Sequence, residues 1–98
     1  MKNALEIVTF KIKDGTGVSG FLAASADMEE HFAKRQKGFV SRTFAKGEGN
    51  DWVDVIRWTT MEDAQAAAKA AMQSPACAPM FGMIDEASVK MMHFEILG

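Results

Sequence analysis

One histidine of the chain has both the chemistry and the surroundings of a catalytic group. His93 lies in the apolar run 88–97, between Met92 and Phe94. Because an imidazole titrates near neutral pH, His93 could serve as a general base or proton shuttle beside a pocket. The alternative is a histidine that is hydrogen-bonded in the core or at a subunit interface, since the sequence does not place the partner that a catalytic histidine needs.

An arginine and an aspartate form a second feature of this kind. Arg42 and Asp54 lie in two runs that are expected to be neighbouring strands, and an even register offset would put them on one face beside Trp58. An inward Arg42 could bind an anionic substrate and stabilise charge, because a guanidinium matches carboxylate geometry. The alternative is an Arg42–Asp54 ion pair inside the sheet, because partly buried charges are normally paired. Trp58 could line a flat aromatic pocket or simply fill the core.

Metal and thiol chemistry receive no support from the spacing. His31, His93, Cys77 and Asp54 do not share the spacing of metal ligands, so we predict no metal site. Cys77 has no nearby His, Lys or Arg to activate it, which favours a buried structural thiol. A single cysteine makes no internal disulfide, and a reducing cytoplasm is the expected location.

Three glycines raise the question of a nucleotide site. Gly15, Gly17 and Gly20 form a G-x-G-x-x-G pattern between a strand-like and a helix-like run. A dinucleotide site also needs a parallel sheet and an acidic residue at the end of the second strand. The second expected strand returns at once through a hairpin and ends in Lys46 without an acid. We therefore interpret the glycines as a turn and a close packing position, and we predict no bound cofactor.

Length and charge limit the class of protein. The chain has 98 residues, which fits a single domain over residues 1–98, and a net charge of -2 with a pI near 5.6. Lys and Arg are scattered, so neither a nucleic-acid nor an anionic-membrane footprint is predicted. No apolar run approaches a membrane span, and the first residues do not have the pattern of a signal peptide.

The periodicity of apolar residues predicts an α+β fold. We expect strands at 4–12, 39–46, 51–58 and 88–97, helices at 18–37 and 59–74, and a short helical turn within 75–85. The longer helices should end at Gly38 and before Pro75, and Thr59 with Glu62 has the spacing of a capping box at the start of the second. The order β-α-β-β-α-β is that of a ferredoxin-like domain, with a four-stranded antiparallel sheet and both helices on one face.

The second face of such a sheet is expected to be apolar. Leu5, Ile7 and Thr9 point to it from the first strand, and either residue set of the last strand adds methionines and further large apolar side chains. An antiparallel sheet that faces water on one side should be polar there, so a partner surface is indicated. The economical partner is a second copy of the chain, sheet against sheet.

The stretch FVSRTFAKGEGNDWVDVIRWTTMEDAQAAA resembles the middle of the dimeric α/β-barrel superfamily, which includes the antibiotic biosynthesis monooxygenase-like domains. The similar features are Arg42, the W-x-D-x-x-x-W strand of Trp52, Asp54 and Trp58, the Thr-Thr-x-Glu start of an Ala-rich helix, and a late apolar strand with His93. The resemblance implies a homodimer whose two sheets close a barrel, with a small-molecule cavity between each sheet and its helices.

The resemblance also implies an activity class. Members include cofactor-free monooxygenases that act on aromatic polyketides or quinols, haem-degrading enzymes and domains without known activity. The three positions that haem degradation uses correspond here to Val8, Ala67 or Ala68, and Met80 or Phe81, which do not fit that chemistry. The chain has no tyrosine, which the polyketide monooxygenases use around the pocket.

Two functions remain as hypotheses from the sequence. The first is a site for a small apolar or aromatic compound, with oxygenase chemistry in which His93 is the base and Arg42 stabilises charge. Its substrate-binding residues would be Trp58, Asp54, Phe21, Met28 and Ala68. The second is a non-catalytic structural or assembly domain with a filled core. A partly polar cavity under the Ala-rich helix would favour the first.

Overall fold

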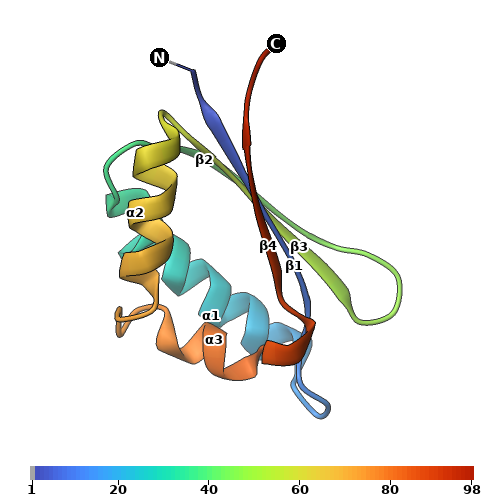
Figure 1. The fold of residues 1–98 in the computed structure, drawn as a ribbon. Coiled ribbons are helices and arrows are strands. Elements are labelled where there is room, and N and C mark those ends of the chain that lie inside the picture. The colour runs from blue at the N-terminus through green and yellow to red at the C-terminus, as the bar shows by residue number, and fades with distance from the viewer. Residues whose placement is uncertain (1) are drawn as a thin grey trace.

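A four-stranded antiparallel sheet carries the helices on one side (Figure 1). The computed structural model describes residues 2–98, and the sheet order is β2-β3-β1-β4. The strands are β1 (Ala4–Lys11), β2 (Phe39–Lys46), β3 (Asp51–Trp58) and β4 (Lys90–Glu95). The helices are α1 (Val18–His31), α2 (Met61–Ala71) and α3 (Ala78–Met83), with short 3-10 turns η1 (Ala33–Arg35) and η2 (Glu86–Ser88). The predicted β-α-β-β-α-β order and ferredoxin-like fold are confirmed.

The helix predicted over 18–37 is too long. The helix α1 ends at His31, and Phe32 leaves helical geometry with φ -129° and ψ -64°. After this break, Phe32 and Ala33 are both buried in the core. Gly38, with φ +85°, instead forms the turn into β2.

The start of α2 is one residue later than the capping box predicts. Thr60 is the N-cap, and its hydroxyl accepts a hydrogen bond from the backbone N–H of Asp63 at 3.0 Å. The hydroxyl of Thr59 donates to the Asp63 carboxylate at 2.9 Å instead. The two adjacent threonines are chemically equivalent, and the sequence alone does not show which of them is the N-cap.

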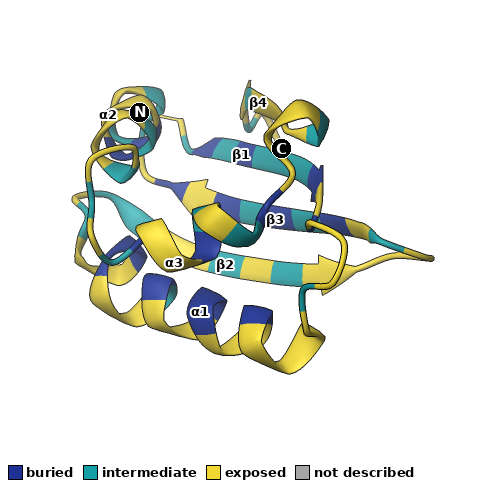
Figure 2. Ribbon diagram, turned by 90° about the horizontal axis from the view of Figure 1, so that it is seen from below, coloured by how far each residue is buried: buried dark blue, intermediate teal, exposed yellow. Residues whose placement is uncertain are grey.

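The helix-facing side of the sheet holds the core (Figure 2). In β1, Ala4, Glu6 and Phe10 are buried, as the alternation of the sequence predicted. Four residues of β3 at alternate positions are also buried: Trp52, Asp54, Ile56 and Trp58. The same face therefore buries two carboxylates among its apolar side chains, which requires partners for their charges.

The core has two parts that leave space between them. One is an aromatic cluster in which Phe21 lies edge-on to Trp52 with ring centroids 5.0 Å apart. The other packs α2 onto the sheet through Ala64 and Ala67, both nearly fully buried, against Trp58. Alanine side chains let this helix approach the sheet closely, and they fill little volume beside the contact.

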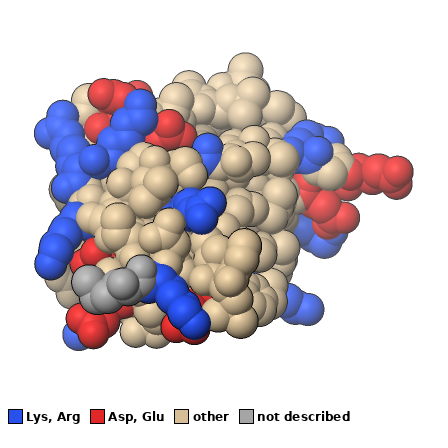
Figure 3. All heavy atoms as spheres, turned by 90° about the horizontal axis from the view of Figure 1, so that it is seen from above, with Lys and Arg blue, Asp and Glu red and all other residues tan. Residues whose placement is uncertain are grey.

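The opposite sheet face carries apolar side chains in register across three strands. Ile7 of β1 pairs with Val55 of β3 on one side and with Met92 of β4 on the other, and Leu5 pairs with Phe94. Figure 3 shows a broad area of uncharged residues on the side opposite to that of Figure 2, with most charged side chains at its edges and a group of Lys or Arg atoms within it. The predicted apolar second face is thus present.

Candidate functional site

A cavity of about 420 Å³ lies between the sheet and the helices α2 and α3. Its wall is largely apolar and is built mainly by Met28, Ala67, Ala68, Met80, Ile84 and Met91. Met72 and Met91, which also line it, are 78% and 49% exposed, so the opening lies between the end of α2 and strand β4. The volume falls within the usual range for small-molecule sites.

Most of the predicted binding residues line this cavity. Trp58, Asp54, Met28 and Ala68 are all part of the wall. Phe21 is not: its ring is fully buried within the aromatic cluster. The correction has a simple cause, because Phe21 lies about two turns before Met28 on α1 and packs against Phe44 and Trp52 instead.

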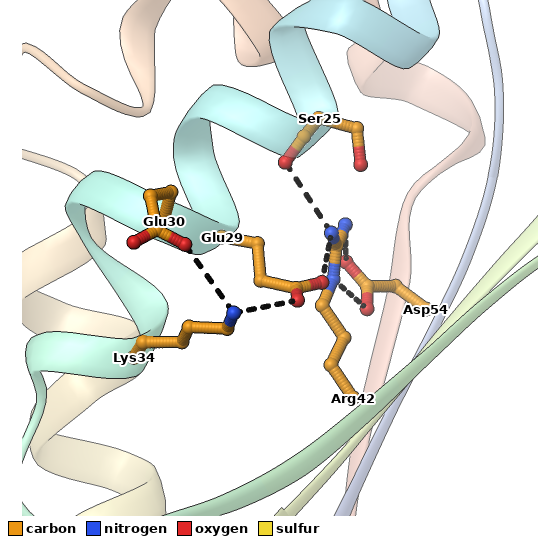
Figure 4. A network of polar contacts seen from close by, with 6 residues as sticks. All are labelled: Ser25, Glu29, Glu30, Lys34, Arg42 and Asp54. Carbon is orange, nitrogen blue, oxygen red and sulfur yellow. Dashed lines mark hydrogen bonds and ion pairs between the residues drawn. The ribbon is translucent and has the colours of Figure 1, made fainter.

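Arg42 forms the ion pair that the sequence left as an alternative (Figure 4). Its Nε and Nη2 each donate to one oxygen of Asp54 at 2.8 Å, and Nη1 donates to the Glu29 carboxylate at 3.2 Å and to the Ser25 carbonyl at 3.3 Å. The Arg42 side chain is 2% exposed, lies over the Phe44 ring, and does not line the cavity. Binding of an anionic substrate by Arg42 therefore does not fit this geometry.

The surroundings of Arg42 stabilise its charge. Burial alone would lower the pKa of Arg42, but the hydrogen bonds and charges of Asp54 and Glu29 offset this effect and raise the pKa above its ordinary value. The guanidinium thus joins α1, β2 and β3 through three nitrogens that all donate within the protein. Its function in the structure is to hold Asp54 against the cavity.

His93 is paired with a carboxylate that the sequence analysis did not select. His93 Nε2 lies 3.1 Å from Glu6 Oε1, and the two residues are directly opposite in the β1–β4 register. The Glu6 side chain is 8% exposed and lines the cavity, whereas His93 lies behind it, 18% exposed. The signal for Glu6 was present, because it is the one acidic residue on the inward face of the first strand.

The environment of Glu6 raises the pKa of its carboxyl group. Burial raises the pKa of Glu6 above its ordinary value of 4.5, and the negative charge of Asp54 adds to the effect. His93 and the indole of Trp58 act in the opposite direction without cancelling it. Trp58 Nε1 is close enough to Glu6 to lower its pKa, yet it is buried with no hydrogen bond of good geometry.

The remaining candidates of the sequence are a thiol and a histidine. Cys77 is a free, fully buried thiol in the cavity wall, and burial raises its pKa above the ordinary value, with Ser74 as a partial offset. His31 is exposed. Within residues 2–98, no group of three or more His, Cys, Asp or Glu side chains could hold a metal ion, and no helix is long and apolar enough to cross a membrane.

Comparison with solved structures shows which known fold this chain has. No protein-family model matches the sequence, and a comparison with curated proteins gives no match. Among solved structures, a putative antibiotic biosynthesis monooxygenase from Bordetella bronchiseptica superposes with a TM-score of 0.81 at 15% identity, covering 99% of both chains. The chain has the antibiotic biosynthesis monooxygenase-like fold. The fold expected from the sequence resemblance is thereby confirmed.

Two further neighbours show how widely this fold is used. SnoaB from Streptomyces nogalater, a cofactor-independent oxygenase, has a TM-score of 0.66 at 19% identity, over 100% of this chain and 94% of that one. A nipsnap family protein of unknown function from Agrobacterium tumefaciens has a TM-score of 0.66 at 17% identity, over 97% and 88% of the two chains. At these identities the likeness shows the fold alone, so function must be argued from the cavity.

Replacing Arg42 tests whether the buried ion pair supports the site. Arg42→Met should lower the free energy of unfolding by about 3–5 kcal/mol, because Asp54 is left as a buried unpaired charge. The double variant Arg42→Met/Asp54→Asn should lose less than the single variant. Urea unfolding measures both. Lys11→Met, which breaks the exposed Lys11–Asp51 pair, is the control and should cost less than about 1 kcal/mol. Equal losses for Arg42→Met and Lys11→Met would contradict the assignment.

The raised pKa of Glu6 predicts a pH-dependent stability. The folded protein holds the Glu6 proton more tightly than the unfolded chain, so this contribution is complete below pH 4.5 and is lost as the pH rises through the folded pKa. Glu6→Gln stays neutral throughout, and its stability relative to wild type should therefore rise over that range. Urea unfolding from pH 4 to pH 7 measures the difference. Glu48→Gln in the exposed hairpin loop is the matched control, and a flat difference for Glu6→Gln would refute the prediction.

Proposed function

We propose that this protein binds a small apolar or aromatic compound in the cavity and oxidises it with molecular oxygen without a cofactor. The observation that carries the proposal is a cavity of about 420 Å³ whose apolar wall includes one buried carboxylate paired with a histidine. The oxygenase neighbour SnoaB supports the reaction class through its fold. The protein would be a monooxygenase-like enzyme whose substrate must fit the space beneath α2.

The chemistry requires a proton acceptor at the wall and an apolar space for substrate and oxygen. Glu6 contacts the cavity, so it is the catalytic residue in this proposal, and His93 shares the proton through the 3.1 Å contact. Removal of a proton from an activated CH₂ group leaves a carbanion, which forms a C–O bond with O₂. Loss of water from the resulting hydroperoxide leaves a carbonyl, so substrate and O₂ balance with the ketone and one water. In this proposal Glu6, and not His93, is the group that contacts the substrate.

The alternative is a structural or assembly domain with a filled core. The Arg42–Asp54 pair and the packed aromatic cluster of Phe21 are features expected for it. The cavity is not, because a structural domain gains nothing from unfilled volume, and cavities lower stability in proportion to their size. The unfilled space beneath Ala67 and Ala68 therefore favours the binding function.

The apolar sheet face supports a homodimer. Met92 and Phe94 are 40% and 48% exposed, and they continue a patch formed with Leu5, Ile7 and Val55. A face of this kind on a small protein is costly in water, and a second copy brings an equally apolar and similarly twisted surface. We assign the partner as a second copy that packs sheet against sheet to close a barrel.

A cytoplasmic location completes the proposal. The single cysteine, Cys77, is a free thiol, as expected in a reducing compartment. Because it is fully buried in the wall, oxidation in another compartment would place a polar group in the apolar cavity. Localisation of the tagged protein by fractionation tests this point.

Filling the cavity should abolish binding. Ala68→Phe places a phenyl ring in the space, so a small compound retained through purification should fall at least tenfold in occupancy in native mass spectrometry. Ala66→Phe, on the exposed side of the same helix, is the matched control and should retain the compound. Oxygen uptake with the identified compound should fall about a hundredfold in Glu6→Gln. Retention and turnover in Ala68→Phe equal to wild type would exclude this cavity as the site.

Introducing one charged residue on the apolar sheet face tests the dimer proposal. Phe94→Asp should convert the protein from dimer to monomer at micromolar concentration, because a buried carboxylate would face the partner's apolar residues. Leu22→Asp on α1, with nearly the same exposure, should remain a dimer. Size-exclusion chromatography with light scattering measures the mass. A monomeric wild type would disprove the dimer.

A further inference from the structure

The ionisable residues of the cavity wall all carry the same sign of charge. Glu6, Asp54 and Glu86 line it, and within the described chain no Lys, Arg or His side chain does. The nearest buried cation, Arg42, stands behind Asp54 and not in the wall. A ligand in the cavity therefore meets carboxylates and apolar groups, without a cation to pair with.

Arg42 has no surplus positive charge to offer through Asp54. It is shared by two carboxylates, Asp54 at 2.8 Å and Glu29 at 3.2 Å, and Lys34 lies 3.9 Å from Glu29 on the exposed side (Figure 4). Lys34 also lies 3.3 Å from Glu30, so these five side chains carry two positive and three negative charges. Both oxygens of Asp54 are occupied by Arg42.

Glu86 is exposed, so Glu6 is the buried wall carboxylate that remains available to a ligand inside the cavity. His93 contacts only its Oε1, at 3.1 Å. Oε2 forms no hydrogen bond within residues 2–98, and it is not among the fully buried unpaired atoms, so it is accessible beside the cavity that Glu6 lines. An ionised carboxyl group in that position accepts a hydrogen bond from a ligand and repels a negative charge.

We propose that the cavity selects apolar compounds with a hydrogen-bond-donating head group, a hydroxyl or a protonated amine, and excludes anionic compounds of the same size. The head group lies on Glu6 Oε2, and the apolar body lies under Ala67 and Ala68. This inference rests on the proposed function, since it assigns ligand chemistry to the same cavity. It is the opposite of one of the two alternatives from the sequence, in which an inward arginine would bind an anion.

Four probes with one ring system test the selection. They are 2-naphthalenemethanol, 2-naphthalenemethylamine, 2-naphthoate and 2-methylnaphthalene, each measured by equilibrium dialysis at pH 7.5. We expect the alcohol and the amine to bind at least tenfold more tightly than the carboxylate. In Glu6→Gln the carboxylate should come within about threefold of the alcohol, whereas Glu48→Gln should keep the wild-type ranking.

The outcomes separate this inference from the proposed function. If 2-methylnaphthalene binds, is blocked in Ala68→Phe, and naphthoate binds as tightly as the alcohol, the selection is wrong and the cavity function stands. If none of the four probes binds wild-type protein, both are overturned. Should Glu6→Gln fail to fold, the wild-type ranking alone decides, because a carboxylate that ranks first or equal refutes the proposal.

Discussion

The bidentate contact between Arg42 and Asp54 is the interaction on which the rest of the site depends. It places two charges on the helix-facing side of a small sheet, where burial is expensive unless every lone pair and proton has a partner. Ser25 and Glu29 of α1 supply the other partners, so the pair also fixes that helix over β2 and β3. Because Asp54 is held there, Glu6 on the neighbouring strand lies in a negative as well as an apolar environment, and it keeps its proton more tightly.

The two parts of the core differ in packing: the aromatic cluster is tightly packed, and the part beneath α2 borders the cavity. The aromatic cluster around Phe21 and Trp52 is closed, with rings in edge-on and stacked contacts that leave little room for rearrangement. The α2 side is built from alanines and bounded by methionines, which pack adaptably around an occupant. The polar pair Glu6–His93 and the Arg42–Asp54 pair both lie on strands, which hold their positions more firmly than loops would.

Periodicity alone predicted the order of elements, the inward face of the first strand and the apolar second face of the sheet. It did not predict the end of α1, because the burial of Phe32 and Ala33 is a tertiary effect that local pattern does not contain. The Glu6–His93 pair joins residues 87 positions apart, and their meeting depends on a strand register that no local signal encodes. For Arg42 the sequence left two alternatives, and the bidentate contact with Asp54, supported by Glu29 and Ser25 on the helix above, decides between them. Phe21 was assigned to the wrong part of the core because the space between the two clusters has no signature in sequence.

The alanine-built contact of α2 has a consequence for how this protein can diverge. The volume of the cavity is determined on the helix, at positions such as Ala67 and Ala68, whereas the charges are determined on the strands. Substitutions on the helix can therefore widen or narrow the space while the ion pairs on the strands keep their partners. Evolution can explore the size of the bound molecule and the chemistry done on it as separate traits. Such separability would allow one fold to persist at identities of 15–19% across neighbours that include an oxygenase and a protein of unknown function.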